Sequence, residues 1–119
     1  SSASVIVWLP LFNTTRMRQP RPDATEFCLA ALDEFERLPS SEVQFVAFEI
    51  AALGQGGLHV DDTDEKYTLK SLPGRKFSGL QLVAMMYVAF KGIDPDMDVG
   101  FDLSKEYAQA RDVFQARQR

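Results

Sequence analysis

Apolar residues recur at helical spacing between residues 23 and 38. The spacing, about 3.6 residues per turn, is carried by Phe27, Ala31, Phe35 and Leu38. Most charged residues of the segment fall on the opposite side, as on an amphipathic helix. Asp23 followed by Glu26 is typical of a helix start, because a carboxylate there accepts a hydrogen bond from a first-turn amide. Pro39 follows, so the pattern predicts a helix over residues 23–38.

Two further segments are apolar on more than one helical face. The first begins at Ser40 or Ser41 and runs to about Leu53, before a glycine-rich stretch. Its only polar side chains after the start are Glu42, Gln44 and Glu49.

The second of these segments, Leu80–Lys91, is apolar on almost every side. Ser78 and Gln81 form a capping-box pattern at its start, and Gly92 closes it. A helix that is hydrophobic all round has to be buried all round. The two apolar helices therefore predict a central pair around which the rest of the chain packs.

A last helix begins at Ser104, with Tyr107, Ala110 and Phe114 on its inner face and charges outside. The chain thus predicts an all-α fold of about four helices packed around the central apolar pair, within residues 23–119. Residues 1–22 contain Pro20 and Pro22 and predict an extended N-terminal arm.

A minor β-ribbon is the one expected exception to the helical class. Val5–Leu9 is β-branched and aromatic, and Tyr67–Leu69 alternates weakly. Tyr67–Leu69 is therefore a candidate to pair with Val5–Trp8 as a small two-stranded ribbon. The sequence Leu72-Pro73-Gly74 is typical of a turn.

Composition narrows the class of protein. The 119 residues are enough for one domain, and 45% hydrophobic with 25% charged residues is ordinary for a soluble one. A net charge of −4 argues against nucleic acid as a partner, and no apolar run is long enough for a membrane span. The single Cys28 falls in an apolar helical run, which predicts a buried thiol and a cytoplasmic setting. We expect no cofactor.

The excess of apolar helix surface has two explanations, and both remain open. Either the two apolar helices are wrapped by the rest of the chain, or one face meets a protein partner or a second copy. The predicted contact residues are Trp8, Phe12, Phe45, Phe48, Met85, Met86, Tyr87 and Phe90. This surface favours a non-catalytic helical interaction or structural module, either part of a larger protein or a homo-oligomer.

The alternative is a small enzyme or a cation-binding regulatory domain that uses the acidic loops. Asp94, Asp96 and Asp98 have the spacing that places carboxylates around a hard cation, although Val99 stands where an EF-hand loop needs glycine. His59 lies close to three aspartates that could complete a metal site or a general base: Asp61, Asp62 and Asp64. No nucleophile motif accompanies either loop, so no catalytic residue is assigned.

Overall fold

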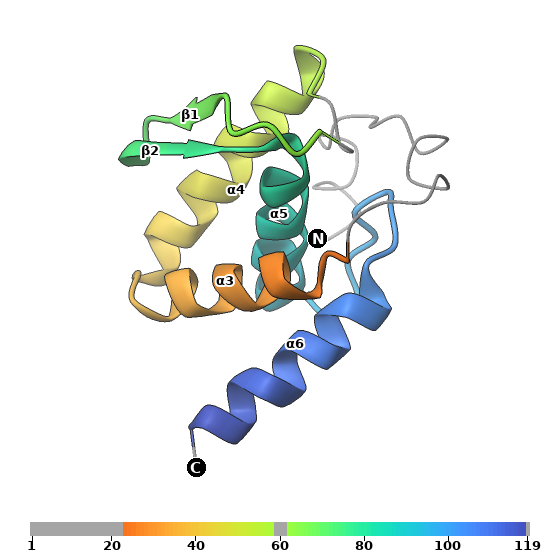
Figure 1. Cartoon of the computed structure of the whole chain (residues 1–119). Helices are drawn as coiled ribbons and strands as arrows, with labels where there is room; N and C mark the ends of the chain where they lie inside the picture. Colours follow the sequence, from red (N-terminus) through yellow and green to blue (C-terminus); the bar gives the residue numbers. More distant parts are fainter. Residues whose placement is uncertain (1–22, 59–61, 119) are drawn as a thin grey trace.

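The computed structural model describes residues 23–58 and 62–118, which form four helices and one β-hairpin (Figure 1). In chain order these are α3 (Thr25–Glu36), α4 (Ser40–Gln55), β1 (Tyr67–Leu69), β2 (Leu72–Phe77), α5 (Gly79–Ile93) and α6 (Ser104–Arg117). The prediction of a mostly helical fold with a small ribbon is confirmed. The predicted arm over residues 1–22 lies outside the described residues.

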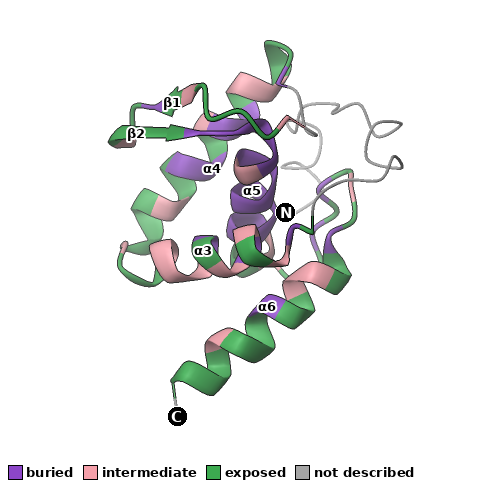
Figure 2. Ribbon diagram, in the orientation of Figure 1, coloured by how far each residue is buried: buried purple, intermediate pink, exposed green. Residues whose placement is uncertain are grey.

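Helix α5 is the most deeply buried element of the described chain. Every residue from Gly79 to Phe90 except Gln81 is buried, and Figure 2 shows its ribbon largely in the colour of buried residues. The helix starts with the predicted capping box. The Gln81 amide donates to Ser78 Oγ at 3.1 Å, and the Ser78 amide donates to Gln81 Oε1 at 2.7 Å. Two first-turn donors are thereby satisfied, which fixes where this apolar helix begins.

Helix α4 has one buried face and one exposed face. Its buried residues are Val46, Ala47, Ile50 and Ala51. Phe45 and Phe48 keep 64% and 48% of their surface exposed. The two helices that the sequence predicts as a central apolar pair therefore differ in burial: α5 is enclosed, whereas α4 packs on it from one side.

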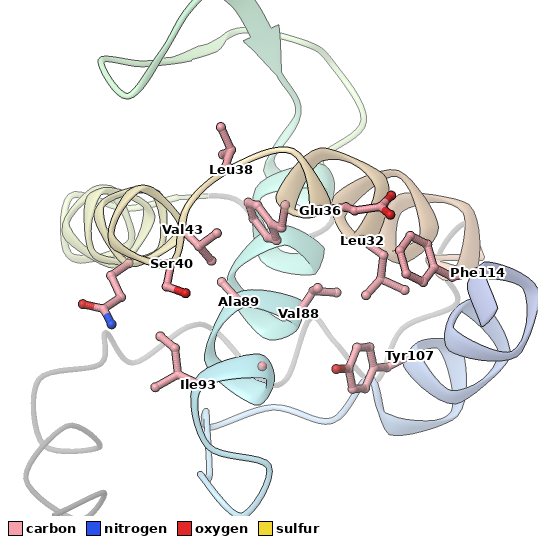
Figure 3. Close-up of a pocket in the computed structure, with 13 residues that line it drawn as sticks. Leu32, Glu36, Leu38, Ser40, Val43, Val88, Ala89, Ile93, Tyr107 and Phe114 are labelled. Carbon is pink, nitrogen blue, oxygen red and sulfur yellow. The ribbon is translucent and has the colours of Figure 1, made fainter. Parts of the chain in front are cut away.

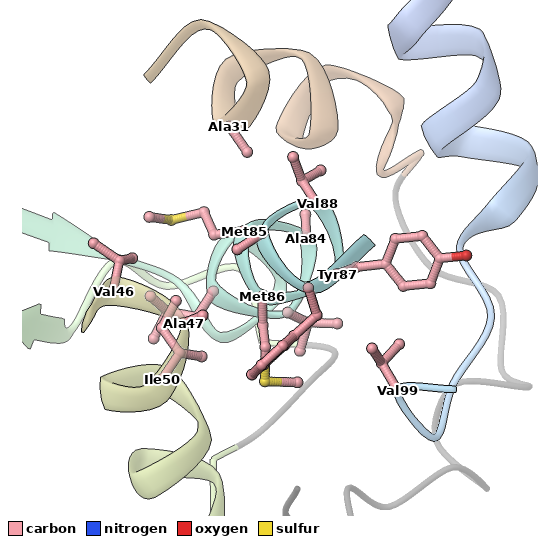
Figure 4. Packing of buried hydrophobic residues seen from close by; sticks show 14 of the residues in the cluster. Ala31, Val46, Ala47, Ile50, Ala84, Met85, Met86, Tyr87, Val88 and Val99 are labelled. Atoms are coloured by element: carbon pink, nitrogen blue, oxygen red, sulfur yellow. The ribbon is translucent and has the colours of Figure 1, made fainter. Parts of the chain in front are cut away.

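The core collects side chains around α5 from several directions. Figure 4 shows Ala31 of α3, Val46 of α4 and Val99 of the loop before α6 around this helix. Cys28 is also buried, as its position in an apolar run predicts. Helix α6 packs mainly on α3, buries only Ala110 and extends away from the other elements towards its C-terminal end (Figure 1).

The β-hairpin gives Tyr67–Leu69 a strand partner that the sequence does not predict. Tyr67–Leu69 is a strand as expected, and within the described residues it pairs antiparallel with Leu72–Phe77. The predicted partner Val5–Trp8 lies outside those residues, so that pairing stays a prediction. The turn falls at Lys70-Ser71, so Leu72-Pro73-Gly74 is strand instead of turn. Proline is tolerated there because, among the described residues, β2 pairs with β1 alone and is an edge strand.

One carboxylate of α4 holds this turn in place. Glu49 accepts hydrogen bonds from the amides of Lys70 and Ser71 at 2.5 and 3.0 Å and from the Ser71 hydroxyl at 2.7 Å. Burial raises the pKa of the Glu49 carboxyl, but these hydrogen bonds outweigh burial and hold the pKa below its ordinary value. The hairpin is thus tied to α4 through a charge-assisted contact.

The helix ends lie within about two residues of the predicted ones. The capping of α3 differs in detail, because Ala24 occupies the N-cap and no side chain caps the helix there. Asp23 instead accepts hydrogen bonds from the Thr25 amide and hydroxyl at 2.9 and 2.7 Å. Asp23 is predicted to be the N-cap residue, but it lies one residue before the N-cap and accepts its hydrogen bonds from there.

Candidate functional site

An open apolar groove lies between the helices of the described chain. It encloses about 590 Å³ and is bordered by α3, α4, α5 and α6 (Figure 3). Its apolar and aromatic lining consists of Leu32, Phe35, Leu38, Val43, Val88, Ala89, Ile93, Tyr107 and Phe114. Among the described residues, Glu36 is the one charged side chain that lines it, beside the neutral Ser40 and Gln44. The lining therefore favours apolar side chains over polar ligands.

The packing of the four helices explains why the groove stays open. Val88 and Ala89 of α5 have short side chains in the middle of the groove, and α3 and α4 diverge from a tight corner at Leu38-Pro39 (Figure 3). Phe114 of α6 borders the side near Leu32. Between these walls, no described element covers the C-terminal end of α5, where Ile93 is 44% exposed.

The structure separates the residues that the sequence predicts as one contact surface. The four from α5 lie in the core, since Met85, Met86, Tyr87 and Phe90 are each at most 5% exposed. Side chains buried to this extent belong to the hydrophobic core of the described chain. Trp8 and Phe12 lie outside the described residues.

The two predicted contact residues of α4 are exposed. Phe45 and Phe48 share one side of the helix with the small residues Ser41 and Ala52, and we call these four residues the α4 stripe. The ring of Phe48 packs edge-on against the buried Phe90 ring, with centroids 5.7 Å apart and planes at 80°. The outer part of the Phe48 ring is thus held in place while it remains accessible.

Sequence reasoning missed most of the groove. The α5 residues that line it are Val88, Ala89, Gly92 and Ile93, near the end of the helix. Their partners come from α3 and α6, which look like ordinary amphipathic helices in the sequence. The pattern of residues within one helix does not indicate a site that four separate helices form together. It predicts the apolar residues of each helix only as core residues.

The acidic loop before α6 uses its carboxylates for local turns. Asp94 accepts a hydrogen bond from the Asp96 amide at 3.0 Å, and Asp98 accepts one from the Gly100 amide at 2.9 Å. Such bonds are typical of aspartate-initiated turns. Over residues 23–58 and 62–118, no group of three or more His, Cys, Asp or Glu side chains is placed to hold a metal ion.

The second acidic cluster is only partly described. Asp62 accepts a hydrogen bond from the Asp64 amide at 2.9 Å and forms an ion pair with Lys66 at 2.6 Å. His59 and Asp61 lie outside the described residues. The geometry that is described therefore brings no titratable pair together in the manner of a general acid and base.

Tyr87 belongs to an aromatic cluster beside the groove. Its ring meets those of Phe101 and Tyr107 at centroid distances of 5.8 and 5.7 Å. Burial, aided by the negative charge of Asp102, raises the pKa of Tyr87 to about 12. The phenol therefore remains neutral at physiological pH, and its ring contacts join α5 to Tyr107 of α6 and to Phe101 of the preceding loop.

Comparison of the chain with protein-family models, with curated proteins and with solved structures found no match. None of the helices in the described parts of the chain has the length and apolar character that crossing a bilayer requires. Any assignment of function therefore has to come from the surfaces of the chain itself.

Proposed function

We propose that the domain is a non-catalytic interaction module that binds an amphipathic helix of a protein partner in the apolar groove. The observation that carries the proposal is the groove itself, to whose lining the described residues contribute nine apolar or aromatic side chains and a single charge. Helical partners dock in such grooves through apolar residues spaced three and four apart. The predicted cytoplasmic setting, which rests on the single buried Cys28, belongs to the same proposal.

Burial of apolar surface supplies the driving force for this binding. Ile93 is 44% exposed and Val43 is partly exposed, so both can lose contact with water when a partner helix enters. Each 100 Å² of apolar surface removed from water contributes roughly 2.5 kcal/mol before the costs of association. The groove is largely preformed, because Val88 and Ala89 are fixed by the packing of α5.

Charge indicates the polar side of the partner helix. Glu36 is exposed where it lines the groove, and the chain carries a net charge of −4. A partner with Lys or Arg next to its apolar stripe is attracted to this surface, whereas an acidic one is repelled. The partner is thus an amphipathic helix with basic residues at the edge of its apolar face.

The test is selection from a displayed library of helical peptides, with apolar residues at i, i+3, i+4 and i+7 and all charge types at the other positions. We expect the selected peptides to be enriched in Lys and Arg and to bind saturably. Ile93→Asp should weaken that binding by about tenfold or more, because it places a charge in the groove.

Val113→Asp is the matched control. Val113 is also a β-branched residue, is 42% exposed and does not line the groove. It should leave the affinity unchanged, and both variants should keep the wild-type melting temperature within a few degrees. Absence of any saturable peptide, or equal affinities for the Ile93→Asp variant and the wild type, contradicts the proposal.

A further inference from the structure

The described part of the chain has a second pocket, between α5, α6 and the loop that joins them. It encloses about 440 Å³ and lies next to the groove, with Gly92 and Tyr107 bordering both. The rest of its lining consists of Tyr87, Lys91, Pro95, Ser104 and Arg111. Of the described residues in this lining, the charged ones, Lys91 and Arg111, are both cations. The chain as a whole carries a net charge of −4, so this positive charge is local.

Each of the two cations is held beside a tyrosine ring of its own helix, because residues four apart lie on one side of a helix. In α5, Lys91 Nζ lies 5.6 Å from the centre of the Tyr87 ring. In α6, the Arg111 guanidinium carbon lies 5.6 Å from the centre of the Tyr107 ring. The two rings meet edge-on with centroids 5.7 Å apart, and Figure 4 shows Tyr87 extending from α5 towards α6. The ring contacts thus keep two positive charges beside the same pocket.

The partners of both cations within the described residues are neutral. Lys91 Nζ donates hydrogen bonds to the Met97 carbonyl at 2.6 Å and to the Pro95 carbonyl at 3.4 Å. An ammonium group has three N–H donors, so one is left for a ligand. The residues three and four positions from Arg111 in α6 are also without negative charge: Tyr107, Ala108, Phe114 and Gln115. Neutral partners orient a cation and leave its charge uncompensated, so an anion that enters the pocket gains charge-assisted hydrogen bonds.

Two carboxylates lie near this pocket without lining it. Asp102 and Glu106 are close enough to Tyr87 to raise the pKa of its phenol, although burial is the larger cause. Asp102 accepts a hydrogen bond from the Ser104 amide at 2.8 Å, and Glu106 lines a separate polar pocket with Lys105. These two charges reduce the positive potential around the pocket but do not occupy it. The pocket is therefore suited to a single anionic group and not to a polyanion.

We propose that this pocket binds the phosphate group of a small phosphorylated molecule, with Lys91 and Arg111 as its charged contacts. Arginine presents a planar fork to two oxygens, and lysine presents a point charge to a third. A phosphate group offers three acceptor oxygens and can therefore use donors from both helices. Ser104 and Tyr107 line the same pocket, and their hydroxyl groups can donate further hydrogen bonds. A volume of about 440 Å³ is in the range of small-molecule sites. The inference goes beyond the proposed function and does not depend on it.

Titration of the full chain with inorganic phosphate, followed by NMR of the backbone amides and the arginine Nε–H groups, tests this site. Ionic strength is held constant with sodium chloride. We expect saturable shift changes centred on Gly92, Ser104 and Arg111, with a dissociation constant of roughly 1–10 mM, because the contacts are few and open to water. Chloride at the same ionic strength should not reproduce them. Shift changes that do not saturate, or that chloride reproduces, overturn the proposal.

Two charge-removing variants and a matched control assign the binding to this pocket. Arg111→Gln and Lys91→Met should each raise the dissociation constant for phosphate by about tenfold, because each removes a charge-assisted contact. Arg111 is exposed, so Arg111→Gln should keep the wild-type melting temperature. Lys105→Gln removes the same charge from an exposed residue of α6 outside the lining, and should change the constant by less than about twofold. Unchanged affinity in Arg111→Gln, or an equal loss in Lys105→Gln, overturns the proposal.

Discussion

Helices α4 and α5 are both rich in apolar residues, yet the fold treats them differently. Helix α5 is enclosed along its length from Gly79 to Phe90, whereas α4 leaves Phe45 and Phe48 in water. The difference arises from the number of neighbours. Helix α5 lies against both α3 and α4, while α4 meets α5 on one face and the hairpin through Glu49. The apolar composition of a helix predicts that it has to be buried. The arrangement of the other elements determines how much of its surface is in fact buried.

The largest expected contrast is between a phenylalanine of each helix. Phe90→Ala should cost about 3–5 kcal/mol of unfolding free energy, because Phe90 is fully buried and the substitution leaves a cavity. Phe45→Ala removes the same atoms from a ring that is 64% exposed, and should change stability by about 0.5 kcal/mol or less. Urea denaturation measures both. Similar losses for the two variants would remove the distinction between the helices.

A smaller contrast separates the two glutamates of α4. Glu49→Gln should destabilise the chain by about 1 kcal/mol at neutral pH, because the amide is a weaker acceptor for the three donors of the Lys70-Ser71 turn. Glu42→Gln should change little, since Glu42 is exposed. The native pKa of Glu49 is lowered, so its stabilising contribution is present above the ordinary glutamate pKa.

That contribution is lost as the pH falls through the lowered native pKa of Glu49. The stability difference between wild type and Glu49→Gln should therefore shrink in acid. Denaturation curves at neutral pH and at acidic pH measure the change. A difference that stays constant over this range would show that the carboxylate charge does not hold the turn.

The smallest contrast concerns the helix starts. Ser78→Ala should cost about 1 kcal/mol, because Ser78 accepts from the Gln81 amide at the start of α5. Ser40→Ala at the start of α4 should cost less, since Pro39 is the N-cap there and no side chain caps the helix. Thermal unfolding compares the two. Equal shifts in melting temperature would mean that the capping box adds nothing to α5.

The features that the sequence predicts well are those determined by neighbouring residues. The start of α5 follows from Ser78 and Gln81, and the apolar run behind them predicts its burial. The turn was predicted at Leu72-Pro73-Gly74, which is strand, because the actual turn at Lys70-Ser71 lacks glycine and is held by Glu49, a residue distant in the chain. A turn stabilised from another element leaves no local signal.

The candidate sites show the same limit. Phe45 and Phe48 were predicted as contact residues and are exposed, but the sequence could not separate them from core residues such as Met86. That choice depends on which helix becomes enclosed, and so on packing over the whole fold. The groove depends on α3 and α6 as well, whose inner faces look in sequence like those of any amphipathic helix.

The most direct test of the groove as a binding site is methyl NMR of the chain labelled at Ile, Leu and Val, titrated with a selected peptide. The account predicts the largest shift changes at Leu32, Val43, Val88 and Ile93, which line the groove. Little change is expected at Val113, which is half-exposed outside it. Changes largest at Val113, or spread evenly over the chain, would contradict the groove as the site of binding.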